Sequence, residues 1–99
     1  MNLEEAIVLV DRKINEPDPS WPDKPKMIVL SEHTVEKEWG WVFFYQSQRY
    51  LETDNFSDRL AGNAPYIVNR QTGDCVVTGA AYPTEHYIQE YEAKLKNNG

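Results

Sequence analysis

The chain has 99 residues and carries 10 basic against 16 acidic side chains, a formal net charge of −6. This length suits a single domain, and no apolar run approaches the roughly 20 residues that span a bilayer. The acidic balance argues against binding to nucleic acid, whose phosphates require clustered lysines and arginines.

The only cysteine, Cys75, excludes an internal disulfide and is typical of a reducing compartment. The sequence begins with Met-Asn-Leu-Glu-Glu, which is acidic where a secretory signal would be basic and then continuously apolar. These features predict a small cytoplasmic protein that does not associate with membranes.

The first predicted element is a helix. Asn2 and Glu5 have the spacing of a capping box, in which each side chain accepts from the backbone N–H of the other residue. An apolar stripe follows at helical spacing, made of Leu3, Ala6, Ile7, Val10 and Ile14. The helix must end before Pro17.

Residues 16–25 contain prolines at positions 17, 19, 22 and 25. Proline removes amide donors and favours extended backbone in the residue before it, so a stiff, extended connector is predicted. Two interpretations are open. The segment is either a PxxP ligand for another domain or a connector pinned by Trp21 packing on the fold, and the second is favoured.

Two apolar runs, residues 26–30 and 39–45, predict an antiparallel pair of strands separated by a polar segment. Alternation along the second run predicts two faces, Trp39, Trp41, Phe43 and Tyr45 on one and Val42 and Phe44 on the other. Because both faces are apolar, this strand is expected to be central or to extend into an interface, which leaves a homodimer open. Tyr50 and Leu51 are expected to continue it.

The second half of the chain predicts a short helix, a hairpin and a long helix. Phe56 and Leu60 are spaced for one or two helical turns within residues 53–65. Strands at 66–68 and 75–78 flank a loop in which Gly73 can take a positive φ, the pattern of a hairpin. Pro83 then suits an early helical position, before a stripe made of Tyr87, Ile88, Tyr91 and Leu95. Residues 97–99 are expected to fray.

Together these elements predict an α+β fold in a single domain over residues 1–99. The order is helix, two strands, a short helix, two strands and a helix. Each terminal helix has one apolar stripe to bury. An antiparallel sheet of about four strands, with both terminal helices packed against it, satisfies that requirement.

No catalytic, cofactor-binding or metal-binding pattern is present in the sequence. His33 lies in a polar turn and His86 on the C-terminal helix, with no ligand spacing that links them. Cys75 lies in a predicted strand without a motif that would activate a thiol. We therefore expect no enzyme, no cofactor and no metal.

Acidic side chains gather between residues 32 and 58, where six carboxylates oppose Lys37 and Arg49 for a local charge of −4, with aromatic residues interleaved. Charge steers the encounter with a basic protein and aromatic side chains anchor it. The alternative is that the carboxylates keep the protein soluble around an aromatic core, which composition alone favours. The candidate partner-binding residues are Glu36, Glu38, Tyr50, Glu52, Asp54 and Asp58.

The sequence resembles the YrhB-domain family, also called the immunity protein 35 type, in three segments: Gly-Trp-Val-Phe-Phe-Tyr-Gln-Ser at 40–47, Tyr-Leu-Glu-Thr at 50–53 and Leu-Ala-Gly-Asn-Ala-Pro-Tyr-Ile-Val at 60–68. Its C-terminal half is similar to that family in Gly73, Thr78-Gly79, Tyr82-Pro83 and the helix around 87–91. The resemblance covers about residues 3–92. The proline-rich connector is less typical of the family.

This resemblance implies a small α+β immunity protein that binds and neutralises a cognate toxin made by the same cell, with no catalytic residues. Some family members resemble small stress-linked proteins, which leaves open a chaperone-like protein that holds exposed apolar segments of its clients. The resemblance favours the recognition surface at residues 32–58, with a basic toxin as partner.

Overall fold

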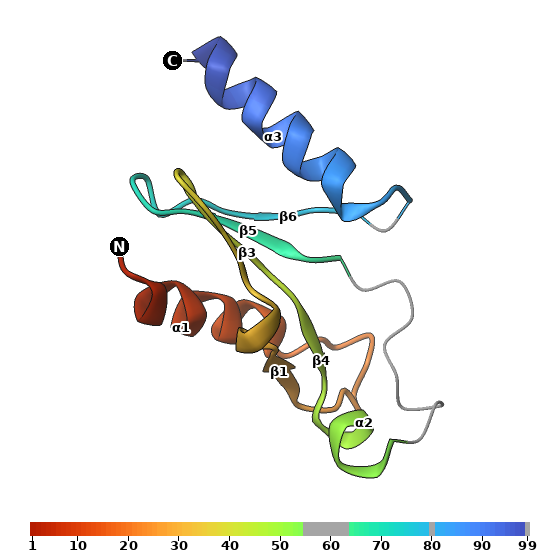
Figure 1. Cartoon of the computed structure of the whole chain (residues 1–99). Helices are drawn as coiled ribbons and strands as arrows, with labels where there is room; N and C mark the ends of the chain where they lie inside the picture. The colour runs from red at the N-terminus through yellow and green to blue at the C-terminus, as the bar shows by residue number, and fades with distance from the viewer. Residues whose placement is uncertain (55–63, 80, 99) are drawn as a thin grey trace.

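The computed structural model describes residues 1–54, 64–79 and 81–98, and its elements give the α+β class that the sequence predicts (Figure 1). In chain order they are α1 (Leu3–Ile14), β1 (Met27–Val29), the 3-10 helix η1 (Ser31–His33), β2 (Val35–Lys37), β3 (Gly40–Phe43), β4 (Tyr45–Ser47), α2 (Gln48–Thr53), β5 (Tyr66–Asn69), β6 (Cys75–Val77) and α3 (Thr84–Asn98). Phe56 and Leu60, on which the predicted helix at 53–65 depends, lie outside the described residues.

Within the described residues the strands form two antiparallel sheets. The larger has the order β2-β3-β5-β6, and the smaller pairs β1 with β4. β3 is central in the larger sheet, where Trp41 lies opposite Glu36 of β2 and Val68 of β5. The predicted hairpin is confirmed: β5 and β6 pair directly, and Gly73 between them has a φ of 76°.

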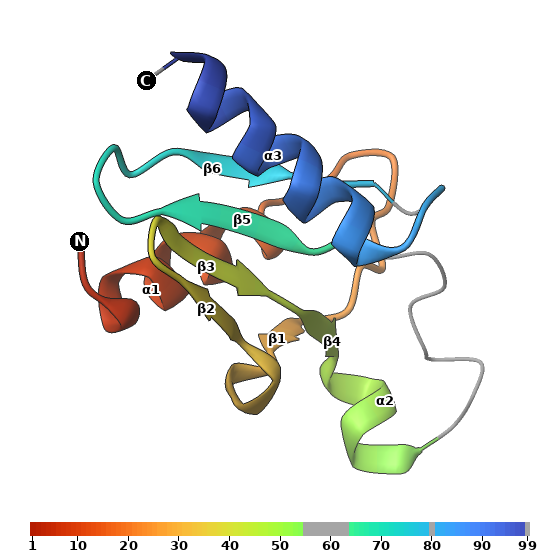
Figure 2. The same cartoon turned by 45° about the horizontal axis from the view of Figure 1, so that its top comes forward.

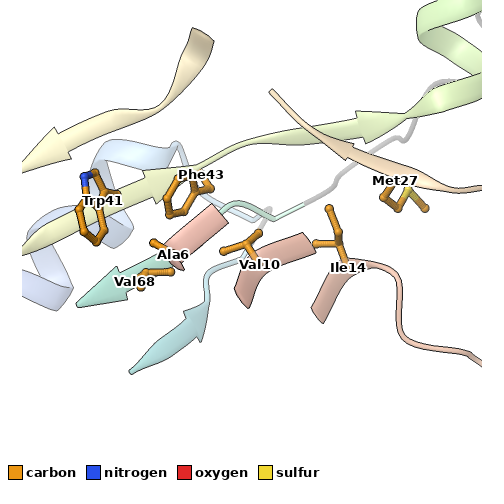
Figure 3. Packing of buried hydrophobic residues seen from close by; sticks show 7 residues of the cluster. All are labelled: Ala6, Val10, Ile14, Met27, Trp41, Phe43 and Val68. Carbon is orange, nitrogen blue, oxygen red and sulfur yellow. The ribbon is translucent and has the colours of Figure 1, made fainter. Parts of the chain in front are cut away.

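The two terminal helices cover opposite faces of the larger sheet, as Figure 1 shows with α1 below the strands and α3 above them. Alternate residues of β3 supply the two cores. On the α1 face, the buried residues are Ala6, Val10, Ile14, Met27, Trp41, Phe43 and Val68 (Figure 3). On the α3 face, Val42 and Ile67 pack against Ile88. The prediction of a strand covered on both sides is therefore confirmed.

The apolar run at 39–45 is not one strand, as the sequence predicts, but two. β3 ends at Phe43 and β4 begins at Tyr45, and the Phe44 carbonyl between them accepts from the Leu30 N–H at 2.8 Å. Among the described strands β1 pairs only with β4, Met27 lying opposite Ser47 and Val29 opposite Tyr45. β1 does not pair with β3 because the polar segment between the two apolar runs forms β2, which occupies that edge of β3.

Two further expectations for this region are wrong. Trp39 packs with the α3 core rather than beside Trp41, because it lies in the turn before β3 and outside the alternation of the strand. Tyr50 and Leu51 belong to α2, not to a strand. The Ser47 hydroxyl caps that helix by accepting from the Tyr50 N–H at 3.1 Å, which turns the chain out of the sheet.

The predicted capping box of α1 is present: the Asn2 side chain accepts from the Glu5 N–H at 2.8 Å, and the Glu5 carboxylate accepts from the Asn2 N–H at 3.1 Å. The connector at 16–25 is folded into turns rather than extended, because the Asp18 carboxylate accepts from both the N–H and the hydroxyl of Ser20. Trp21 is 41% exposed, so it is less covered than the favoured interpretation requires. The helix α3 extends to Asn98.

Candidate functional site

The candidate partner-binding residues lie at two ends of the molecule. Glu36 and Glu38 belong to β2 and the turn that follows it, whereas Tyr50, Glu52 and Asp54 belong to α2 and its C-cap (Figure 2). The chain between them, residues 40–47, is mostly extended and spans about 25 Å at the usual rise of a strand. Asp58 lies outside the described residues. The described candidate residues therefore form two separate surfaces rather than one.

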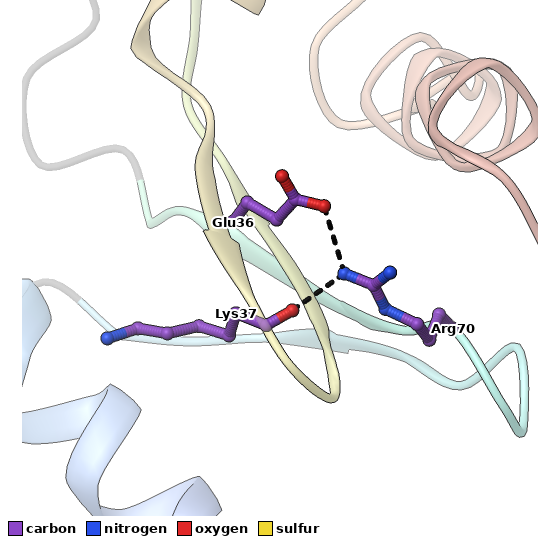
Figure 4. A network of polar contacts seen from close by, with 3 residues as sticks. All are labelled: Glu36, Lys37 and Arg70. Atoms are coloured by element: carbon purple, nitrogen blue, oxygen red, sulfur yellow. Dashed lines mark hydrogen bonds and ion pairs between the residues drawn. The ribbon is translucent and has the colours of Figure 1, made fainter.

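Glu36 is exposed but already paired. Its carboxylate accepts from Arg70 Nη2 at 3.1 Å, and the same nitrogen donates to the Lys37 carbonyl at 2.7 Å (Figure 4). The guanidinium of Arg70 lies 4.8 Å from the centre of the Trp41 ring, a cation–π contact. Glu36 thus ties β2 to the β5–β6 hairpin, and the adjacent guanidinium offsets part of its charge.

Glu38 lies at the rim of a groove of about 650 Å³ between the β2–β3 turn and α3. We call this groove, lined by Glu38, Trp39, Gln89, Glu92, Ala93, Leu95 and Lys96, the Trp39 groove. The Trp39 indole N–H donates to Glu92 Oε2 at 3.1 Å, and its ring centre lies 4.8 Å from that of Tyr91. The aromatic residue of this surface is therefore already engaged by α3.

The second surface is built on α2, and we call Leu51, Glu52 and Asp54 the α2 surface. All three residues are exposed, Leu51 by 47%, and Tyr50 beside them is half-buried. Asp54 ends the helix in the left-handed conformation at φ 56°, with its N–H donating to the Tyr50 carbonyl at 2.7 Å. This geometry holds two carboxylates next to one exposed apolar side chain.

Leu51 is an exposed residue of this surface that sequence reasoning did not single out. A strand at this position would place Leu51 and Tyr50 on opposite faces, and the larger aromatic ring is then the better candidate for an anchor. The signal that could have found it is Ser47, a good N-cap residue directly before Gln48-Arg-Tyr-Leu-Glu-Thr53.

Reactive side chains are few in the described part of the chain, where no group of three or more histidines, cysteines or carboxylates is arranged to hold a metal ion. His33 is exposed on η1, and His86 Nε2 lies 3.0 Å from Glu90 Oε2 on α3. Burial raises the pKa of the Cys75 thiol, although the nearby Lys13 ammonium opposes this shift. A raised pKa keeps this thiol protonated at neutral pH, which is the opposite of what a nucleophile needs.

Comparison of the sequence with known protein families gives a match. The model of the immunity protein 35 family, Imm35, matches residues 4–93. The chain belongs to the immunity protein 35 family.

A second comparison agrees. The chain is 44% identical over 77 residues to the uncharacterized protein YrhB of Escherichia coli strain K12, an alignment that covers 78% of this chain and 79% of that protein. No solved structure matches the chain significantly.

The family match spans nearly all of α1 and most of α3, so it includes the α2 surface, the connector and the Trp39 groove except for Leu95 and Lys96. Membership in the immunity protein 35 family implies neutralisation of a toxin in general terms, and immunity proteins are typically binders rather than enzymes. No helix in the described residues is both long and apolar enough to cross a membrane.

Proposed function

We propose that this chain neutralises one cognate toxin by binding it in a fixed ratio, without turnover, in the cytoplasm of the cell that makes the toxin. The observation that carries the proposal is the family match over residues 4–93, nearly the whole of the folded chain. A stoichiometric binder blocks a toxin by occupancy and needs neither a cofactor nor a catalytic group.

We further propose that the α2 surface is the docking site. Of the candidate residues, Glu36 is paired with Arg70. Glu38 lines the Trp39 groove, in which the Trp39 side chain already contacts α3. Leu51 by contrast is 47% exposed beside Glu52 and Asp54. An apolar anchor flanked by carboxylates fits a basic patch that has an apolar pocket at its centre.

Physical chemistry assigns different tasks to these side chains. The carboxylates, which stay in solvent, should speed association with a basic toxin, and this effect should fall as salt shortens the Debye length to about 8 Å near 0.15 M. Leu51, buried on docking, should slow dissociation.

The test compares the two acidic surfaces by stopped-flow association with the cognate toxin. The α2 variant combines Glu52→Lys with Asp54→Asn, since asparagine tolerates the left-handed backbone at that position. The matched control is Glu38→Lys on the Trp39 groove. Both variants must first show the melting curve of the parent.

We expect slower association and a weaker salt dependence for the α2 variant, and parent-like behaviour for Glu38→Lys. The reverse order would move the docking site to the Trp39 groove. A parent chain that fails to protect cells from the cognate toxin would refute the function itself. Protection of many unrelated aggregating proteins, without a toxin complex, would support the chaperone-like alternative.

A further inference from the structure

β6 is an edge strand whose outer side has no partner among the described residues. On its inner side it pairs with β5, and the flanking bonds run from the Asn69 N–H to the Asp74 carbonyl at 2.9 Å and from the Thr78 N–H to the Pro65 carbonyl at 3.0 Å. Hydrogen-bonded and non-hydrogen-bonded positions alternate in an antiparallel ladder. The backbone N–H and C=O groups of Cys75 and Val77 therefore point to the open edge.

The two edges of the larger sheet differ in how strongly they discourage pairing with a further strand. The opposite edge strand, β2, carries Glu36 and Lys37, and charged side chains discourage further pairing. β6 consists of Cys75, Val76 and Val77, with no charge, and its valines are 42% and 56% exposed. β6 thus combines free backbone groups with exposed apolar side chains.

We propose that this edge binds a second copy of the same chain, with the two β6 strands antiparallel about a twofold axis at Val76. In this register Cys75 of each copy lies opposite Val77 of the other. The outward-pointing N–H and C=O groups of Cys75 then bond to those of Val77 in the other copy, because the two residues lie one position on either side of the axis. The larger sheet continues through both molecules, and the exposed valines are covered.

The charged residues of α3 beside the β6 edge are compatible with the same twofold axis. A groove of about 170 Å³ lies between β6 and α3, and its lining includes Val76, Tyr87, Tyr91, Glu90 and Lys94. Glu90 and Lys94 stand one helical turn apart. A twofold axis reverses the direction of α3 in the second copy, so the Glu90–Lys94 rows of the two copies run antiparallel, an order in which acid can face base. Glu90 also lies 3.0 Å from His86 Nε2 of its own helix. The antiparallel order is self-complementary despite the net charge of −6 on each chain.

Disulfide trapping tests the register. In the proposed dimer the two Val76 residues form a non-hydrogen-bonded pair, whose Cα atoms lie about 4.5 Å apart, within the range that a disulfide spans. We expect Cys75→Ala with Val76→Cys to give a covalent dimer under mild oxidation. The matched control, Cys75→Ala with Val35→Cys, places the thiol on β2, at a valine of similar exposure (36%), and should stay monomeric. Equal trapping of both variants, or of neither, would overturn the proposal.

Sedimentation equilibrium tests the association without oxidation, on the parent chain, Val76→Lys and Val35→Lys from roughly 1 μM to 1 mM. We expect the parent and Val35→Lys to dimerise and Val76→Lys to remain monomeric, each with a folded circular dichroism spectrum. A parent that stays monomeric throughout refutes the proposal and leaves the edge to a strand of another protein. The α2 surface lies on a different element, so the toxin-docking test is decided separately.

Discussion

Phe43 and Val42 show how neighbouring residues of β3 join a helix to each face of the sheet. The Phe43 side chain is fully buried against α1, while Val42 beside it is buried against α3. Both contacts follow from the alternation of side chains along a strand. The burial of Phe43 therefore fixes which face of the sheet receives α1.

Replacing Phe43 with alanine should lower the free energy of unfolding by about 3 to 5 kcal/mol, because it removes a fully buried ring and leaves a cavity. Urea denaturation followed by tryptophan fluorescence would measure this loss. The control, Val35→Ala, shortens a partly exposed side chain and should change the stability by about 0.5 kcal/mol or less. An unchanged midpoint for Phe43→Ala would contradict its place in the core.

At the scale of elements, Asn15 joins the end of α1 to the start of β1. Its amide nitrogen donates to the Met27 carbonyl at 3.1 Å, and its amide oxygen accepts from the Met27 N–H at 2.8 Å. One side chain thus makes the two bonds that a neighbouring strand would make to Met27. This clamp closes the proline-containing connector and places β1 beside β4.

Asn15→Ala should lower the stability by about 1 to 3 kcal/mol, because it leaves two partly buried backbone groups of Met27 without a partner. Asn15→Asp keeps the acceptor but sets a carboxylate oxygen against the Met27 carbonyl and the Asp11 carboxylate, so it should lower the stability at least as much. Thermal unfolding by calorimetry would rank the variants, with Asn97→Ala on the exposed last turn of α3 as the control. Equal stability of Asn15→Ala and the parent would show that water replaces the clamp at no cost.

For the molecule as a whole, stability should fall at alkaline pH, because three ionisable side chains on the α1 side of the sheets are partly buried. Burial raises the pKa of Tyr45, and the nearby Tyr66 raises it further. Burial also raises the pKa of Tyr66, with smaller effects of Cys75 and Glu16, and it raises the pKa of Cys75 itself. All three groups are neutral when protonated, so folding favours their protonated forms.

Because these pKa values are higher in the folded chain, the associated stability is fully present below the unfolded-state values, about 8.5 for cysteine and 10 for tyrosine. It is lost as the pH rises through the folded-state values. We expect the urea midpoint to fall steadily above about pH 9. The variant Tyr66→Phe, which cannot ionise there, should show a shallower fall. Parallel curves for the two proteins would exclude Tyr66 as a source of the effect.

The sequence by itself determined the features that depend on near neighbours. The capping box of Asn2 and Glu5, the stripe that buries Ala6, Val10 and Ile14, and the β5–β6 hairpin all appear in the structure. These features depend on side chains a few residues apart, whose spacing can be read from the chain. The two-sided burial of β3 could be read in the same way, and with it the α+β class. The segments shared with the immunity protein 35 family were equally visible.

Only the tertiary structure decided strand partners and the state of each acid. β1 pairs with β4 because β2 occupies the edge of β3, and pairing between strands is a choice among distant segments. Glu36 is paired with Arg70, which lies 34 residues away, whereas Leu51 is exposed because Ser47 turns the chain into a helix. Exposure and ion pairing depend on which remote residues arrive at the same place. The pattern of acids and aromatics along the chain could therefore suggest a binding surface, but only the fold could divide it in two.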